Sequence, residues 1–137
     1  MKKFRVWDAE DKVMYKPLSL EELIEGRWEL QSVNGEFSLP QSDYFLGGNY
    51  MWEESIGLED EDGVDIFCGD IVKLQLPLGG FWQGVEIEQI AKVRYEAEKC
   101  AFIAEWKYSK NQNYITINCD LAMKVIGNIY ENPELLK

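Results

Sequence analysis

The stretch that most constrains this chain is residues 57–73, where an acidic turn leads into a strand through a glycine and an aspartate. It reads G-L-E-D-E-D-G-V-D-I-F-C-G-D-I-V-K. Asp62-Gly63 predicts a tight reversal, because glycine accepts a positive φ and aspartate hydrogen-bonds to the nearby backbone. Apolar residues recur over residues 71–76 and predict a half-buried strand that Pro77 ends.

Turn residues elsewhere predict further hairpins. One joins residues 4–7 to residues 13–15 across a polar turn. Asn34-Gly35 predicts a second, since Asn-Gly between two β-prone runs is the strongest short-range hairpin signal. A long hairpin is expected over residues 85–106, with a bulge near Gln89 that restores the alternation of apolar residues. Between the first two hairpins, Ser19 and Gly26 are plausible caps of a short helix over residues 20–25.

These elements predict a mainly β, β-rich α+β fold. It consists of hairpins and a small, partly open barrel similar to SH3-like barrels, with one or two short helices. A length of 137 residues favours a single domain with its own core. The glycine pair at residues 47–48 allows a division into an N-terminal hairpin lobe, residues 1–50, and a C-terminal barrel-like lobe, residues 51–137.

The charge balance argues against several functions. The chain has 25 acidic and 14 basic residues, a formal net charge of −11, and no histidine. A strongly acidic chain repels phosphate backbones, so we expect no direct nucleic-acid binding. The absence of histidine removes the commonest general base and metal ligand. No signal peptide or apolar stretch of about 20 residues is present, so we expect no membrane span and a cytoplasmic location.

Candidate catalytic and metal-binding residues are few. The acidic cluster at residues 59–65 lacks the spacing of an EF-hand loop, so a solvated turn is the better interpretation. Asp65 and Asp70 are a conceivable carboxylate pair, but no other feature supports catalysis. The three cysteines, Cys68, Cys100 and Cys119, have no metal-ligand spacing and are expected to be buried, reduced thiols. The sequence predicts no catalytic residue, no metal ligand and no cofactor.

Phe81 and Trp82 form the only candidate interaction surface that the sequence singles out. They lie between glycines in L-G-G-F-W-Q-G, residues 78–84, and are expected on a loop. Exposed aromatic residues on a loop mark a contact surface. The alternative is that the same residues fold back as a lid on the core, and the sequence does not decide between them.

Three stretches together resemble the YopX family of phage and prophage proteins. They are K-F-R-V-W-D with a following M-Y (residues 3–8 and 14–15), I-G-L-E-D-E-D-G-V-D-I-F-C-G-D-I-V (56–72) and V-I-G-N-I-Y-E-N-P-E-L-L (125–136). Val6, Ile56 and Cys68 depart from the residues that are usual in the family. The resemblance implies a small, β-rich, phage-encoded protein of unassigned activity, and it supplies no catalytic residues.

Three functional hypotheses follow. The first is a non-enzymatic phage accessory protein that contacts a host or phage protein and associates with itself through an aromatic or edge-strand surface. The second is an acidic decoy that binds a basic nucleic-acid-binding protein in place of DNA, which requires a continuous stripe of carboxylates. The third is a carboxylate-based, metal-dependent hydrolase, which requires at least three converging acidic side chains.

Overall fold

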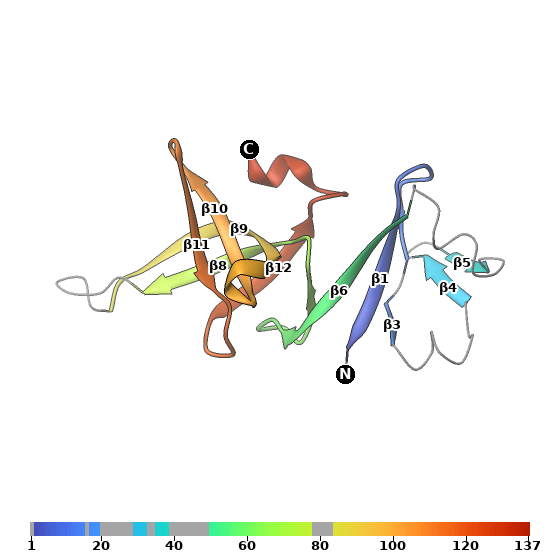
Figure 1. Cartoon of the computed structure of the whole chain (residues 1–137), viewed down its shortest axis with the longest axis horizontal. Coiled ribbons are helices and arrows are strands. Elements are labelled where there is room, and N and C mark those ends of the chain that lie inside the picture. The colour runs from blue at the N-terminus through green and yellow to red at the C-terminus, as the bar shows by residue number, and fades with distance from the viewer. Residues whose placement is uncertain (1, 16, 20–28, 33–34, 39–49, 78–83) are drawn as a thin grey trace. The chain divides into compact units, whose positions relative to one another are not determined.

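Antiparallel strands dominate the described part of the chain. The computed structural model describes residues 2–15, 17–19, 29–32, 35–38, 50–77 and 84–137. These residues fall into two compact units, Met1–Gly57 and Leu58–Lys137 (Figure 1). The helix expected at residues 20–25 lies outside the described residues.

The sheet of the first unit is built around β1 (Lys3–Asp8), which pairs antiparallel with three strands. Its partners are β2 (Val13–Met14), β3 (Leu18–Ser19) and β6 (Tyr50–Glu59), the last of which runs on into the second unit. The polar turn between β1 and β2 is held by the carboxylate of Asp8, which accepts the N–H groups of Glu10 and Asp11 at 2.9 and 3.1 Å. The first predicted hairpin is confirmed.

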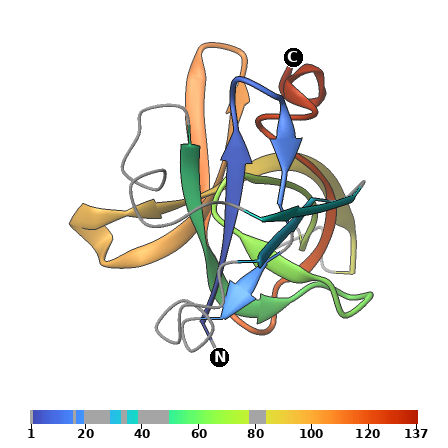
Figure 2. The same ribbon diagram turned by 90° about the vertical axis from the view of Figure 1, so that its right-hand side faces the viewer.

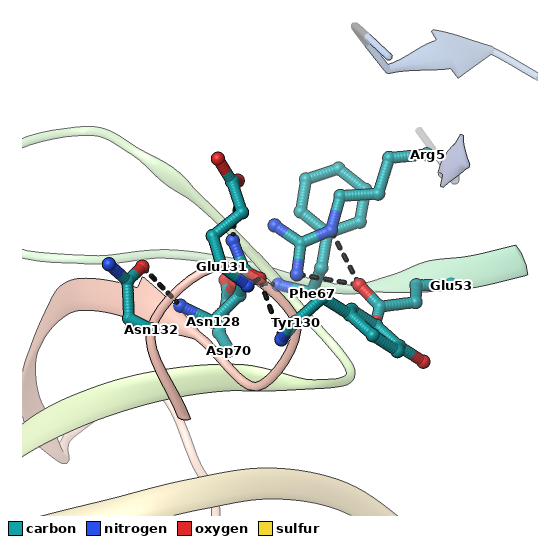
Figure 3. Close-up of polar contacts among 8 residues, drawn as sticks. All are labelled: Arg5, Glu53, Phe67, Asp70, Asn128, Tyr130, Glu131 and Asn132. Atoms are coloured by element: carbon teal, nitrogen blue, oxygen red, sulfur yellow. Dashed lines mark hydrogen bonds and ion pairs between the residues drawn. The ribbon is translucent and has the colours of Figure 1, made fainter. Parts of the chain in front are cut away.

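A buried ion pair joins β1 to β6. Arg5 and Glu53 lie directly opposite each other in the ladder, and both are about 90% or more buried. The guanidinium Nε and Nη2 atoms both contact Oε2 of Glu53 at 2.6 Å (Figure 3). Because a buried charge is tolerated only with a partner, each residue depends on the other.

The second predicted hairpin is also confirmed, although Gly35, expected in its turn, lies in a strand. Strand β4 (Glu29–Ser32) pairs with β5 (Gly35–Ser38), and Ser32 lies opposite Gly35. Gly35 therefore belongs to a strand. The loop residues 33–34 lie outside the described residues.

The second unit is a curled half-barrel of five strands in the order β11-β10-β9-β8-β12. Figure 2 shows how β8, β9 and β12 curl around one another. The strands are β8 (Asp70–Pro77), β9 (Glu86–Glu96), β10 (Ala101–Tyr108), β11 (Asn111–Thr116) and β12 (Ala122–Asn128). A short strand, β7 (Asp65–Phe67), and two 3-10 helices, η3 (Ala97–Lys99) and η4 (Pro133–Leu136), complete the unit. The prediction of a β-rich fold with a partly open barrel and few, short helices is confirmed.

The core of the half-barrel follows from side-chain alternation along paired strands. Val72 lies opposite Ala91, and Val93 lies opposite Ala104, so small and branched side chains meet on one face. All four are completely buried. The bulge predicted near Gln89 is wrong, because the ladder between β8 and β9 runs without a shift along that part of the strand. The irregularity lies instead in β12, between Val125 and Gly127.

A hydrogen-bonded loop closes the end of β12. The side-chain oxygen of Asn128 accepts the N–H groups of Tyr130 and Glu131 at 3.0 and 2.9 Å (Figure 3). Ile129 donates its N–H to the carbonyl of Gly69 at 2.9 Å. These bonds bring the second and third of the stretches that resemble the YopX family side by side, at the start of β8 and the end of β12.

Gly127 is required by close packing at this loop. A Cβ atom at this position would lie 2.5 Å from Oδ1 of Asn132 and 3.0 Å from its Cβ. We expect Gly127→Ala to lower the free energy of unfolding by about 1–3 kcal/mol, because overpacking forces the neighbours to shift. Urea denaturation measures the loss. In an Asn132→Ala background the same substitution should cost less, and equal costs in the two backgrounds would contradict the steric explanation.

Candidate interaction site

The residues predicted from sequence to form a contact surface, Phe81 and Trp82, lie outside the described residues. Carboxylates, thiols, sheet edges and clefts are the features that carry recognition or chemistry.

Asp60 is the structural centre of the acidic turn. Its Oδ1 atom accepts the N–H groups of Asp62 and Val64, and its Oδ2 atom accepts the N–H of Val125, each at 2.9 Å. Burial raises the pKa of Asp60, but the three backbone donors outweigh burial, so that the pKa lies below its ordinary value. The prediction of a solvated turn is wrong for Asp60, which is 9% exposed.

The same turn covers the outer edge of β12. Val125 donates its N–H to Asp60, and the carbonyl of Met123 accepts the N–H of Glu61 at 3.1 Å. Sheet edges otherwise present unpaired backbone groups to other chains. One edge of the half-barrel is thus closed by its own acidic turn.

The remaining candidates for chemistry are structural or isolated. Asp70 is 1% exposed and accepts the N–H of Phe67 at 2.9 Å, as expected of a residue that holds a turn. Within the described parts of the chain, no three cysteine or carboxylate side chains converge to hold a metal ion. The expectation of buried thiols is wrong for Cys100 and Cys119, which are exposed, while Cys68 is half-buried.

The site with the most recognition potential is a split in the sheet between β9 and β10. The ladder of β9 with β8 covers Glu86 to Lys92, whereas its ladder with β10 covers Lys92 to Glu96. The first half of β9 therefore has a partner strand on one side only, among the residues that the structure describes. Its other side is an open backbone edge.

Hydrogen-bond direction shows which groups face this edge. The carbonyl of Val93 accepts the N–H of Gly69, next to β8, at 2.8 Å. Because direction alternates along an antiparallel strand, residues 86, 88 and 90 point their N–H and C=O groups away from β8. Pro77, which has no N–H to donate, lies opposite Glu86, as this alternation requires.

A cleft of about 380 Å³ lies beside the open edge. Its lining comes from β9, β10 and the C-terminal η4 segment: Glu88, Gln89, Ile90, Trp106, Lys107, Leu135, Leu136 and Lys137. The side-chain amide of Gln89 donates to the carbonyl of Ile90 at 3.2 Å and covers one edge acceptor. Apolar side chains and free backbone groups thus meet in one place.

The outer face of the half-barrel is charged, and three of its carboxylates, Glu88, Glu96 and Glu105, have basic partners. Glu105 contacts Arg94 at 2.8 Å and Lys92 at 3.4 Å, and Arg94 also contacts Glu96 at 2.8 Å. Burial raises the pKa of Glu105, but the hydrogen bond and charge of Arg94 lower it by more. The pKa of Glu105 therefore lies below its ordinary value. Glu88, at the cleft, contacts Lys73 at 3.5 Å.

The sequence did not reveal the cleft residues as a group. Trp106 and Ile90 lie within the long hairpin expected over residues 85–106, and leucines such as Leu135 and Leu136 are ordinarily interpreted as packing residues. Leu136 is in fact 43% exposed. The split between β9 and β10 depends on where two ladders stop, and no residue type along β9 signals that point.

A family profile described as YopX protein matches residues 3–137. No curated protein matches the chain. Over the described segments, no helix has the length and apolar character needed to cross a membrane.

A solved structure has a similar fold. The crystal structure of protein EF1440 from Enterococcus faecalis superposes with a TM-score of 0.50, at 21% sequence identity. The match covers 100% of this chain and 99% of that chain. At this level of identity the likeness concerns the fold alone.

Asp60 should make stability depend on acid pH. Its pKa is lowered in the folded state, so its contribution is present above the ordinary value of 3.8 and is lost as the pH falls through the folded value. We expect Asp60→Ala to cost about 3 kcal/mol at neutral pH, because three hydrogen bonds to a charged acceptor are lost.

Urea denaturation at several pH values measures this effect. As the pH falls below 3.8, wild-type protein should lose more stability than Asp60→Asn, which has no charge to titrate. Parallel pH profiles for the two proteins would show that Asp60 does not carry the dependence.

Proposed function

The chain belongs to the YopX family, and from that premise we propose that it is a phage- or prophage-encoded accessory protein that acts by protein contact and not by catalysis. Its partners are an extended segment of a host or phage protein and a second copy of itself. The proposal is supported chiefly by the open edge of β9 beside the cleft.

The edge of β9 has the features of a strand-addition site. An extended peptide gains affinity by pairing its backbone with an exposed strand, and it gains specificity by placing alternate side chains in pockets. Residues 86 and 88 offer backbone donors and acceptors, and Ile90 offers its N–H, since its carbonyl already accepts from Gln89. The ring of Trp106 together with Ile90 offers apolar surface. Ile87 adds an exposed apolar side chain on the same strand, with 42% of its surface accessible.

Charge specifies the partner further. Glu86 and Glu88 are both exposed at the edge, and Glu88 also contacts Lys73 at 3.5 Å, so that Glu86 contributes most to this charge. Opposite charges that lie across from each other on neighbouring strands attract. The preferred segment therefore carries large apolar side chains at alternate positions and Lys or Arg between them.

The two other hypotheses gain no support from the described residues. A DNA-mimicking decoy needs carboxylates in an uninterrupted stripe, yet Glu105, Glu96 and Glu88 each have a basic partner on the half-barrel. A metal-dependent hydrolase needs converging acidic side chains, and the described residues provide no such group. Both remain predictions from sequence.

Selection from a displayed library of random peptides tests strand addition. We expect the selected peptides to alternate apolar residues with Lys or Arg. Trp106→Ala should weaken their binding at least about tenfold, since buried aromatic anchors carry most of the energy of an interface. Isothermal titration calorimetry gives the dissociation constants.

Tyr108→Ala is the matched control. Tyr108 is an aromatic residue two positions along β10, is 72% exposed and lies outside the cleft lining. The Tyr108→Ala variant should bind the selected peptides with the same dissociation constants as wild-type protein. Peptides that bind Trp106→Ala as tightly as wild-type protein would rule out the cleft as their site.

Divalent cations should have no effect on stability. Because no three acidic side chains converge among the described residues, we expect millimolar Mg²⁺ or Mn²⁺ to leave the thermal unfolding midpoint unchanged. Differential scanning fluorimetry with and without chelator makes the comparison. A rise in the midpoint that the chelator reverses would favour the hydrolase hypothesis.

A further inference from the structure

The half-barrel has a second exposed edge, at β11. In the strand order β11-β10-β9-β8-β12, β11 and β12 are the two end strands, and the acidic turn covers only β12. Over the described part of the chain, β11 has one partner strand, β10. Its outer side is available for another strand.

The direction of the backbone hydrogen bonds alternates along β11, as it does along β9. Ile117, just after the strand, donates its N–H to the carbonyl of Phe102 on β10 at 3.0 Å. Residues therefore alternate between facing β10 and facing outward, and Gln112, Tyr114 and Thr116 face outward. Tyr108 lies opposite Asn111 across a two-residue turn, as this assignment requires.

β11 lacks the usual protection of an edge strand. Natural edges carry Lys, Pro or bulges that prevent pairing with other chains. The sequence of β11 is N-Q-N-Y-I-T, with no charge and no proline, and its ladder with β10 runs without a shift. Two copies of a chain with a net charge of −11 repel each other at most surfaces, but β11 brings no carboxylate of its own to such a contact.

We propose that β11 pairs antiparallel with β11 of a second copy, about a two-fold axis that passes beside Tyr114. In this register Tyr114 exchanges both backbone hydrogen bonds with Tyr114 of the second copy, and Gln112 bonds to Thr116. Every outward backbone group of the three residues then has a partner. The contact is isologous and closes as a dimer, in which the two half-barrels form one continuous sheet.

The side chains suit this register. Tyr114 is 50% exposed, and the ammonium group of Lys99 lies 4.7 Å from the centre of its ring. The neighbours across the new pair are tyrosine with tyrosine and glutamine with threonine, and aromatic and hydroxyl pairs of this kind stabilise antiparallel strands. The pairing extends the self-association in the proposed function and rests on that part alone, since peptide binding at β9 uses another strand.

Light scattering coupled to size-exclusion chromatography, over a range of concentrations, tests the dimer. We expect wild-type protein to dimerise and Tyr114→Lys to raise the dissociation constant about tenfold or more, because like charges then face each other across the two-fold axis. Urea denaturation checks that the variant still folds, since the new ammonium group would lie near Lys99 as well as opposite Glu105 on β10. Tyr108→Lys, an equal change at an exposed tyrosine away from the outer edge, should dimerise like wild-type protein.

Cysteine crosslinking tests the register. In a Cys100→Ser, Cys119→Ser background, Tyr114→Cys should form a disulfide-linked dimer, because facing Cα atoms of such a pair lie about 5.5 Å apart. Gln112→Cys is the control on the same strand, since the two copies of residue 112 would lie about 13 Å apart along the strands. A monomeric wild-type protein, or equal crosslinking at residues 112 and 114, would overturn the proposal. Peptide binding to the β9 edge by monomeric Tyr114→Lys would show that the proposed function stands without it.

Discussion

The constraint on which this fold depends is that backbone N–H and C=O groups at the edges of an open sheet need partners. A closed barrel has no edges, but a half-barrel has two. At β12 the problem is solved within the chain: one carboxylate, Asp60, holds its own turn and accepts the N–H of Val125, and the neighbouring Glu61 bonds to Met123. A turn that looks like a solvated acidic loop is therefore part of the sheet.

Elsewhere the same constraint underlies the proposed recognition surface. The first half of β9 pairs with β8 and the second half pairs with β10. The two ladders overlap at Lys92 alone. Where they separate, backbone groups lie open beside the apolar side chains of Trp106 and Leu135. The proposed binding surface arises here because the strands diverge. The ion pairs of Glu105 and Glu88 with basic neighbours stabilise the charged outer face around this edge.

Much of the fold could be predicted from local sequence, because turns and alternation act over short distances. Asp62-Gly63 reverses the chain as expected, with Gly63 at a φ of 78°. The hairpin near Asn34 forms, although Gly35 lies in strand β5, since pairing along both strands decides the register and not the turn residues alone. The predicted bulge at Gln89 is wrong for a related reason: β9 changes its partner strand and keeps its pleat.

The sequence by itself determined the fold class, the main turns and the resemblance to the YopX family, since each rests on residue type and short spacing. Only the tertiary structure decided that Asp60 is buried, that Cys100 and Cys119 are exposed, and that Trp106 borders a cleft. Asp60 reaches Val125 across 65 positions of sequence. The cleft exists because two ladders end at different points. Long-range pairing of this kind is set by the free energy of the whole sheet, which no local pattern records.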